Sequence, residues 1–254
     1  MSTNDDLWIR RFHPANGADA RLVCLPHAGG SASFYFPVSQ ALSPTVDVLA
    51  VQYPGRQDRR GERCIENIGA LADEIARVLR SWTDRPLALF GHSMGAILAF
   101  EVTRRLERDA DTVPFGLFAS GRRAPSTRRA ESVHLRDDDG IVAELKRLNG
   151  TDSSVLGDDE LLRMVLPATR SDYRAVETYV CEPGATVRAP ITVLTGDADP
   201  KTTLDEARAW SAHTTGDFDL RVYSGGHFFL TSHAKDINAE IARYFALRRN
   251  GSLI

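Results

Sequence analysis

Residues 86–106 read PLALFGHSMGAILAFEVTRRL, and the class of fold can be inferred from them. The apolar run Pro86–Phe90 is typical of a strand buried in a parallel sheet, and the residues from Ala96 onward have a helical pattern. Between them lies the pentapeptide Gly91–Gly95, which has the form G-x-S-x-G. A strand, this pentapeptide and a helix together indicate a nucleophile elbow, a tight turn that exposes the serine hydroxyl. We therefore predict that Ser93 is a nucleophile.

The composition is that of an ordinary globular protein. The chain has 254 residues, of which 43% are hydrophobic and 26% are charged, which suits one sizeable core in one large α/β domain. A formal net charge of −3 disfavours a general role in nucleic-acid binding. The three cysteines are far apart and form no C-x-x-C motif, so neither a disulfide framework nor a metal site is indicated.

The first residues carry no targeting signal. Residues 1–6 lack the basic region and apolar core of a signal peptide, and no run of about 18 apolar residues occurs in the chain. We therefore expect a cytoplasmic protein without membrane contact. No feature of the sequence signals a subunit interface, so a monomer is expected.

Apolar runs alternate with helical patterns along the chain. This alternation predicts an α/β fold with a mostly parallel sheet and helices on both faces. The predicted strands are Leu7–Phe12, Arg21–Leu25, Val46–Gln52, Leu87–Phe90, Phe115–Ser120, Ile191–Thr195 and Leu220–Tyr223. The predicted helices are Phe34–Leu42, Ile65–Ser81, Gly95–Arg108, Thr203–His213 and Ala234–Arg248.

One segment interrupts this alternation. About 70 residues separate Ser120 from Ile191, far more than a single crossover helix needs. Because this segment follows a strand whose C-terminal end should face the site, we predict a helical lid at about residues 122–185, inserted in a single domain that spans 1–254. A surface insertion without a role in the site is the alternative. The helical patterns of the segment are Asp139–Leu148, ended by Gly150, then Asp158–Leu166 and Ala168–Tyr179.

A nucleophilic serine needs a base, and in elbow enzymes the chain order is serine, acid, histidine. Four histidines follow Ser93. His227 lies in SGGHFF (224–229), directly after the last predicted strand, on a loop that can reach the C-terminal edge of the sheet. His134 falls in the predicted lid, and His213 and His233 lie on or beside polar helices. We therefore predict that His227 is the base.

The acid is expected in LTGDADP (194–200), again directly after a strand. Asp197 and Asp199 are two residues apart, so alternation along the chain does not choose between them. One would orient the imidazole, and the other would accept hydrogen bonds from loop amides. Pro200 stiffens the backbone beside Asp199, which favours Asp199.

Backbone amides are expected to stabilise an oxyanion at this site. One candidate is the amide of Met94, which follows the nucleophile and begins a helix. The other is the amide of Ala28, in the glycine-rich stretch PHAGGS (26–31) after the strand Arg21–Leu25. A phosphate-binding loop is the alternative for this stretch, but neither G-K-[ST] nor G-x-G-x-x-G occurs there. No catalytic role is assigned to His27 or His92.

As a set, six motifs resemble those of type II thioesterases, the stand-alone editing hydrolases that accompany modular polyketide and non-ribosomal peptide synthases. The motifs span almost the whole chain in the expected order, and each alone is weak. They are LPHAGGS (25–31), QYPGR (52–56), FGHSMGA (90–96), LPATRSDY (166–173), GDADP (196–200) and GGHFF (225–229).

The resemblance implies an α/β-hydrolase fold and a serine thioesterase. It places the nucleophile on Ser93, the acid on Asp199, the base on His227 and the oxyanion amides on Ala28 and Met94. It also implies that the substrate is a short or aberrant acyl group on the phosphopantetheine arm of an acyl or peptidyl carrier protein, with no cofactor of the enzyme's own. The apolar residues of the predicted lid would cover this acyl group or simply pack the lid: Leu161, Leu162, Met164 and Val165.

Carrier proteins are usually acidic, so a basic docking rim is expected. Arg122 and Arg123 follow the strand Phe115–Ser120 and would leave the sheet at the edge that carries the site, which makes them docking candidates. The alternative is that arginines are scattered widely over an arginine-rich chain.

Three other functions fit the same motifs. A generic serine esterase would act on a free small molecule, and an acyltransferase or cyclase would pass the acyl group to an amine or alcohol. A carrier-binding protein without activity is the third. The complete set of Ser93, Asp199 and His227 argues against this third function.

Overall fold

The computed structural model describes residues 7–149 and 158–249. Its centre is a seven-stranded sheet with the strand order β1-β3-β2-β4-β5-β6-β7. β1 is antiparallel to β3, and the other neighbouring pairs are parallel, so the prediction of a mostly parallel sheet is confirmed. The strands are β1 (Ile9–Arg10), β2 (Arg21–Leu25), β3 (Asp47–Val51), β4 (Leu87–His92), β5 (Gly116–Ser120), β6 (Ile191–Gly196) and β7 (Phe218–Tyr223).

The predicted strands are found within a few residues of their expected bounds. β1 is much shorter than the expected Leu7–Phe12, because it pairs only with β3, through Ile9 and Arg10. β4 is two residues longer than expected, because His92 still pairs with Ser120 of β5. The strand therefore runs directly into the turn that carries Ser93.

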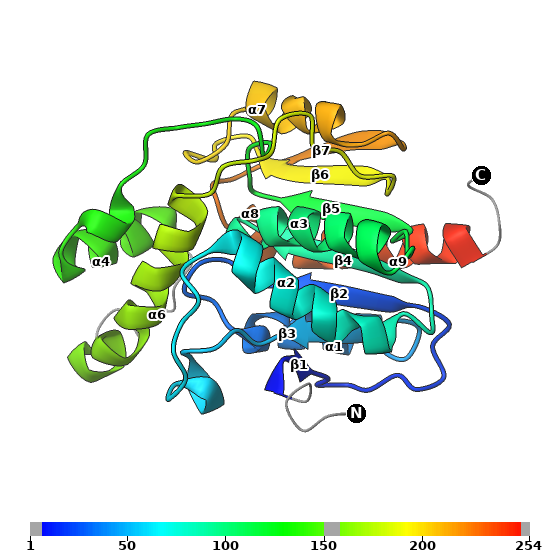
Figure 1. The fold of residues 1–254 in the computed structure, drawn as a ribbon, viewed down its shortest axis with the longest axis horizontal. Helices are drawn as coiled ribbons and strands as arrows, with labels where there is room; N and C mark the ends of the chain where they lie inside the picture. The colour runs from blue at the N-terminus through cyan, green and yellow to red at the C-terminus, as the bar shows by residue number, and fades with distance from the viewer. Residues whose placement is uncertain (1–6, 150–157, 250–254) are drawn as a thin grey trace.

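Helices cover both faces of the sheet (Figure 1). α2 (Ile68–Leu79) and α3 (Met94–Asp109) pack on one face, and α1 (Phe36–Leu42) and α9 (Ala234–Arg249) pack on the other. Each face has its own cluster of buried apolar side chains. The apolar residues that recur at helical spacing along α2 face the core and are all buried: Ile68, Leu71, Ile75 and Val78.

Two short helices lie beside the C-terminal edge of the sheet. α7 (Leu204–Arg208) follows the loop after β6 and continues as a 3-10 helix over Ala209–His213. Thr203 caps α7, because its hydroxyl accepts from the Glu206 amide while the Glu206 carboxylate accepts from the Thr203 amide. α8 (Phe229–Ser232) follows the loop after β7. Both loops are thereby held by regular structure on either side.

The residues between β5 and β6 leave the sheet and form a helical insertion at one end of the molecule (Figure 1). Its helices are α4 (Asp138–Leu148) and α6 (Asp159–Glu177). The prediction of two helices, Asp158–Leu166 and Ala168–Tyr179, is wrong. Pro167 lies inside the single helix α6, where it removes one backbone hydrogen bond. The helix continues because the residues on both sides of the proline, Leu166 and Ala168, are buried against the rest of the protein.

α4 ends at Leu148, as predicted, but its C-terminal cap is Asn149, one residue before the glycine predicted to end the helix. Asn149 adopts the left-handed conformation, with φ 57° and ψ 36°, and its amide donates to the carbonyls of Leu145 and Lys146. Asparagine tolerates this conformation better than most residues and so can end a helix in place of glycine. Gly150 itself lies outside the described residues.

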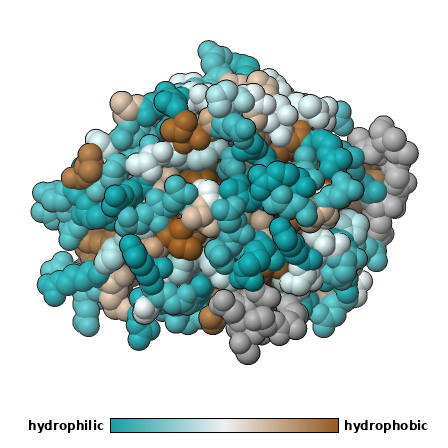
Figure 2. All heavy atoms as spheres, in the orientation of Figure 1, coloured by the Kyte–Doolittle hydropathy of each residue, from teal (hydrophilic) through white to brown (hydrophobic). Residues whose placement is uncertain are grey.

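The face shown in Figure 2 is largely hydrophilic, and its apolar side chains are scattered among charged ones. Among the helices of residues 7–149 and 158–249, none is long and apolar enough to cross a membrane.

Candidate active site

Ser93 lies at the turn between β4 and α3, with His92 ending the strand and Met94 beginning the helix. Its backbone has φ 55° and ψ −115°, a conformation that side-chain-bearing residues rarely adopt. The flanking glycines make the turn possible. A Cβ on Gly91 would lie 2.0 Å from the carbonyl oxygen of Gly95, and a Cβ on Gly95 would lie 2.0 Å from that of Leu25. The structure therefore contains the strand, turn and helix of a nucleophile elbow.

The side chains of Ser93, His227 and Asp199 form a continuous chain of polar contacts. The Nε2 atom of His227 lies 3.0 Å from the Ser93 hydroxyl. The Nδ1 atom of His227 lies 3.0 Å from each carboxylate oxygen of Asp199. The three residues come from the elbow, the loop after β7 and the loop after β6, which meet at the C-terminal edge of the sheet. Tertiary structure thus brings together the three residues predicted from the sequence.

The two aspartates of the loop after β6 have different partners. Asp199 is buried and contacts the imidazole of His227, and its Oδ1 also accepts from the Lys201 amide at 2.8 Å. Asp197 is exposed, and its Oδ1 accepts from the Gly225 amide at 2.9 Å. Alternation along the chain did not choose between the two aspartates for the imidazole and the loop amide, and Pro200 and the family resemblance favoured Asp199 for the imidazole. The contacts distinguish them.

Two further imidazoles surround His227. The ring centroid of His92 lies 5.0 Å from that of His227, and the His27 ring packs edge-on against Phe228 at 4.8 Å. Burial lowers the pKa of His27 to about 3, with a smaller contribution from His227. Burial likewise lowers the pKa of His92 well below its usual range. Both rings are therefore neutral at neutral pH and pack around the site without touching Ser93 through a hydrogen bond.

The glycine-rich turn that carries Ala28 is held in place from two sides. Within the turn, the Gly30 amide donates to the His27 carbonyl at 2.9 Å. From outside, the carboxylate of Asp172 in α6 accepts from the Gly29 amide at 2.8 Å. Asp172 belongs to one of the motifs quoted above, but no local pattern in the sequence indicates this contact, because its partner lies 143 residues earlier.

A pocket opens beside Ser93 and His227, and residues of the insertion form part of its wall. Its apolar lining includes Leu145, Leu148, Tyr173, Val176 and Phe228. The apolar residues expected to cover the site do not line this pocket. Leu161 and Met164 are 37% and 54% exposed, because they lie on the outer side of α6.

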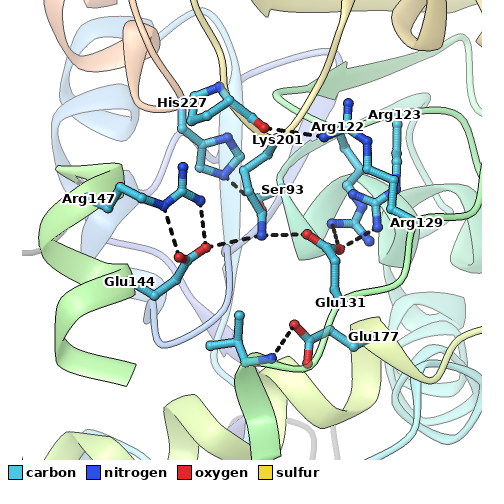
Figure 3. Close-up of polar contacts among 12 residues, drawn as sticks. Ser93, Arg122, Arg123, Arg129, Glu131, Glu144, Arg147, Glu177, Lys201 and His227 are labelled. Carbon is cyan, nitrogen blue, oxygen red and sulfur yellow. Dashed lines mark hydrogen bonds and ion pairs between the residues drawn. The ribbon is translucent and has the colours of Figure 1, made fainter. Parts of the chain in front are cut away.

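The charged side of the same pocket is lined by Arg122, Glu131 and Lys201. In Figure 3 these residues and Glu144 lie together beside Ser93 and His227. Sequence analysis missed Glu131, Glu144 and Lys201. No spacing signals them, because each comes from a different segment of the chain.

The expectation that Arg122 and Arg123 form an exposed docking rim is wrong. Their side chains are only 6% and 5% exposed. Arg123 donates to Glu131, and Arg122 lies 3.9 Å from the same carboxylate. Burial, together with the charge of Arg123, lowers the pKa of Arg122 to about 10, so that it stays charged at neutral pH. Both arginines thus face the carboxylate of Glu131 inside the protein.

The sheet, the elbow and the Ser–His–Asp contacts define an α/β-hydrolase with a serine-hydrolase site. Comparison with known proteins narrows this class. Residues 20–244 match the family model described as a thioesterase domain. The chain is 58% identical over 246 residues to a probable cadicidin biosynthesis thioesterase of Streptomyces griseus, covering 96% of this chain and 68% of that protein. It is 50% identical over 250 residues to thioesterase PikA5 of Streptomyces venezuelae, covering 98% and 89% of the two chains.

The chain also resembles solved structures of thioesterases. The type II thioesterase BorB from the borrelidin biosynthetic cluster superposes with a TM-score of 0.89 at 53% identity, over 96% of this chain and 100% of that one. The chain belongs to the thioesterase family. It is a type II thioesterase, a thioester hydrolase of polyketide and non-ribosomal peptide biosynthesis.

Proposed function

We propose that this thioesterase removes short or aberrant acyl groups from the phosphopantetheine arm of acyl or peptidyl carrier proteins, with Ser93, His227 and Asp199 as its catalytic triad. The observation that supports this most directly is the contact chain from the Ser93 hydroxyl through both nitrogens of His227 to Asp199. The partner class rests on the family to which the chain belongs.

The geometry supports a two-step reaction. The Ser93 hydroxyl attacks the thioester carbonyl, and His227 accepts its proton at Nε2. Asp199 holds the opposite nitrogen and stabilises the imidazolium that forms. The C–S bond then breaks, and the imidazolium of His227 gives its proton to the departing sulfur, which needs little such help because a thiol has a pKa near 8.5. Water, activated by His227, releases the acid from Ser93 in the second step.

The oxyanion of each step would lie near the amides of Met94 and Ala28. Met94 begins α3, so its amide is at the positive end of a helix. Ala28 lines the same pocket as Ser93, in a turn held by the contact between Gly29 and Asp172. Two fixed donors directed at one oxygen are worth several orders of magnitude in rate in enzymes of this type.

The insertion would serve as the lid of a single α/β-hydrolase domain. It spans about residues 122–185, and its helices α4 and α6 supply Leu145, Leu148, Tyr173 and Val176 to the pocket wall. An apolar wall so close to Ser93 suits the acyl part of the substrate.

The proposal is tested by loading acetyl and propionyl groups on a carrier protein and measuring thiol release. The wild type and Ser93→Ala are compared, with p-nitrophenyl esters assayed in parallel. We expect rapid release of the free acid from the carrier by the wild type and loss of this activity in Ser93→Ala. Ester hydrolysis without carrier activity would overturn the carrier assignment. Transfer of the acyl group to an added amine in preference to water would overturn the assignment as a hydrolase.

A further inference from the structure

Three segments of the chain meet at the ammonium group of Lys201 (Figure 3). The Nζ atom lies 2.5 Å from Oε1 of Glu131 and 3.2 Å from Oε1 of Glu144. Lys201 belongs to the loop after β6, Glu131 to the chain after β5, and Glu144 to α4 of the insertion. All three residues are largely withdrawn from solvent, and Lys201 itself is 7% exposed. The ion pairs therefore join the lid helix to the body of the protein.

Further cations hold the two carboxylates ionised. Burial raises the pKa of Glu144, but hydrogen bonds from Arg147 and the charge of Lys201 outweigh it and lower the pKa to about 2. For Glu131, burial is likewise outweighed, by the hydrogen bond from Arg123 and by the charges of Arg122 and Lys201, and the pKa is again about 2. Both carboxylates are therefore charged at neutral pH and attract Lys201.

Lys201 also contacts the reacting machinery. Its backbone amide donates to Oδ1 of Asp199 at 2.8 Å, and its side chain lines the pocket that contains Ser93 and His227. The pocket that would hold an acyl group on Ser93 is lined both by apolar residues of α4, such as Leu145, and by the Lys201–Glu131 pair. A long aliphatic chain would have to pass beside desolvated charges or displace them, which is unfavourable.

We infer that Lys201 determines the acyl-chain selectivity of this site. Its ion pairs with Glu144 and Glu131 hold α4 at the pocket wall and keep one side of the pocket polar, so that short acyl groups fit and long aliphatic chains are disfavoured. Lys201 acts as a positioning residue through Glu144. The inference rests on the proposed function, because it takes the pocket beside Ser93 as the acyl site.

The test compares acetyl, butyryl and octanoyl thioesters of N-acetylcysteamine. The first variant is Lys201→Met, which keeps the length of the side chain without its charge. The second is Glu144→Gln, which replaces the carboxylate by an amide of the same size and tests the same ion pair if Lys201→Met does not fold. Lys146→Met is the matched control, since Lys146 is an exposed lysine on α4, the helix that carries Glu144. We expect the ratio of kcat/KM for octanoyl to that for acetyl to rise about tenfold in both variants, the scale that one or two methylenes carry in an apolar pocket. The control should keep the wild-type ratio.

Hydrogen exchange gives a second readout that turnover does not affect. The amides of α4 should exchange faster in Lys201→Met and Glu144→Gln, while those of β4 and α3 keep their wild-type rates. An unchanged octanoyl-to-acetyl ratio in both variants would overturn the inference, as would faster exchange throughout the protein without a change of ratio. Neither result would affect the proposed function, which depends on whether thioester turnover is lost in Ser93→Ala.

Discussion

Arg56 and Asp172 form a buried ion pair with two parallel contacts. The Nη1 and Nη2 atoms of Arg56 lie 2.7 Å and 2.8 Å from Oδ2 and Oδ1 of Asp172. Both residues also bind the glycine-rich turn, because Asp172 accepts from the Gly29 amide and Arg56 donates to the Gly30 carbonyl. One pair thus fastens helix α6, the loop after β3 and the turn that carries Ala28.

Asp172→Ala should destabilise the protein by about 3–5 kcal/mol, because it leaves Arg56 buried without its counter-charge. Urea unfolding measures this loss. Arg174→Ala is the control on the same helix. Arg174 pairs with Glu66 at 3.0 Å, but both side chains are exposed, so its loss should cost under about 1 kcal/mol. Similar unfolding midpoints for the two variants would contradict a structural role for the buried pair.

Asp199→Asn should lower kcat for thioester hydrolysis by a factor on the order of 10³ or more, because the imidazole of His227 loses the carboxylate that orients it. Asp197→Asn should keep most of the activity, since the exposed Asp197 carboxylate accepts from the Gly225 amide, whereas Asp199 contacts the imidazole of His227. Steady-state kinetics on one carrier-bound substrate compares the two. A severe loss in Asp197→Asn with a mild one in Asp199→Asn would reverse the assignment of the acid.

Gly95→Ala should prevent folding. The added Cβ would lie 2.0 Å from the Leu25 carbonyl oxygen, and because Cβ is bonded directly to the backbone of α3, the two atoms cannot move apart without separating α3 from β2. Soluble yield and circular dichroism measure the effect. Gly61→Ala is the matched control, because its Cβ would meet nothing within 4 Å. A folded Gly95→Ala protein would show that the elbow is looser than the structure indicates.

The stability of the protein should fall in weak acid because of His27. Its pKa is about 3 when folded, against a usual value of 6.5, so below pH 6.5 the unfolded chain binds more protons than the folded one. The stabilisation is complete above pH 6.5 and is lost as the pH falls toward 3. Between pH 7 and pH 5 this residue should remove about 2 kcal/mol from the free energy of unfolding.

His27→Phe tests this pH dependence, because phenylalanine keeps an aromatic ring against Phe228 but does not titrate. Urea unfolding at pH 7 and pH 5 gives the change in the free energy of unfolding for each protein. The variant should lose about 2 kcal/mol less than the wild type over this interval. An equal loss in both proteins would mean that His27 is not a buried neutral imidazole.

Much of the fold could be predicted because its signals are local. Apolar runs and helical stripes mark the strands and helices, and the pentapeptide around Ser93 marks the turn between β4 and α3. The elements least well predicted are those whose limits depend on neighbours. β1 ends where its pairing with β3 ends, and α6 passes through Pro167 because its flanking residues are buried.

Some residues of the candidate site could likewise be predicted from local patterns, and others could not. Ser93 and His227 follow from a motif and from chain order, since the loops after parallel strands meet at one edge of the sheet. The contacts that separate Asp199 from Asp197 need the actual positions of His227 and Gly225. Two aspartates that are only two residues apart therefore bind different partners.

Short patterns and their order along the chain were enough to identify the class of fold and the family, and they predicted Ser93 as the nucleophile and His227 as the base. Tertiary structure decided which charges are exposed and what they bind. Arg122 and Arg123 look like surface arginines in the sequence, but they are buried and contact Glu131, and Lys201 pairs with Glu144 from 57 residues earlier. A buried charge is tolerated only beside its partner, and partners distant in the sequence meet only when the whole chain has folded.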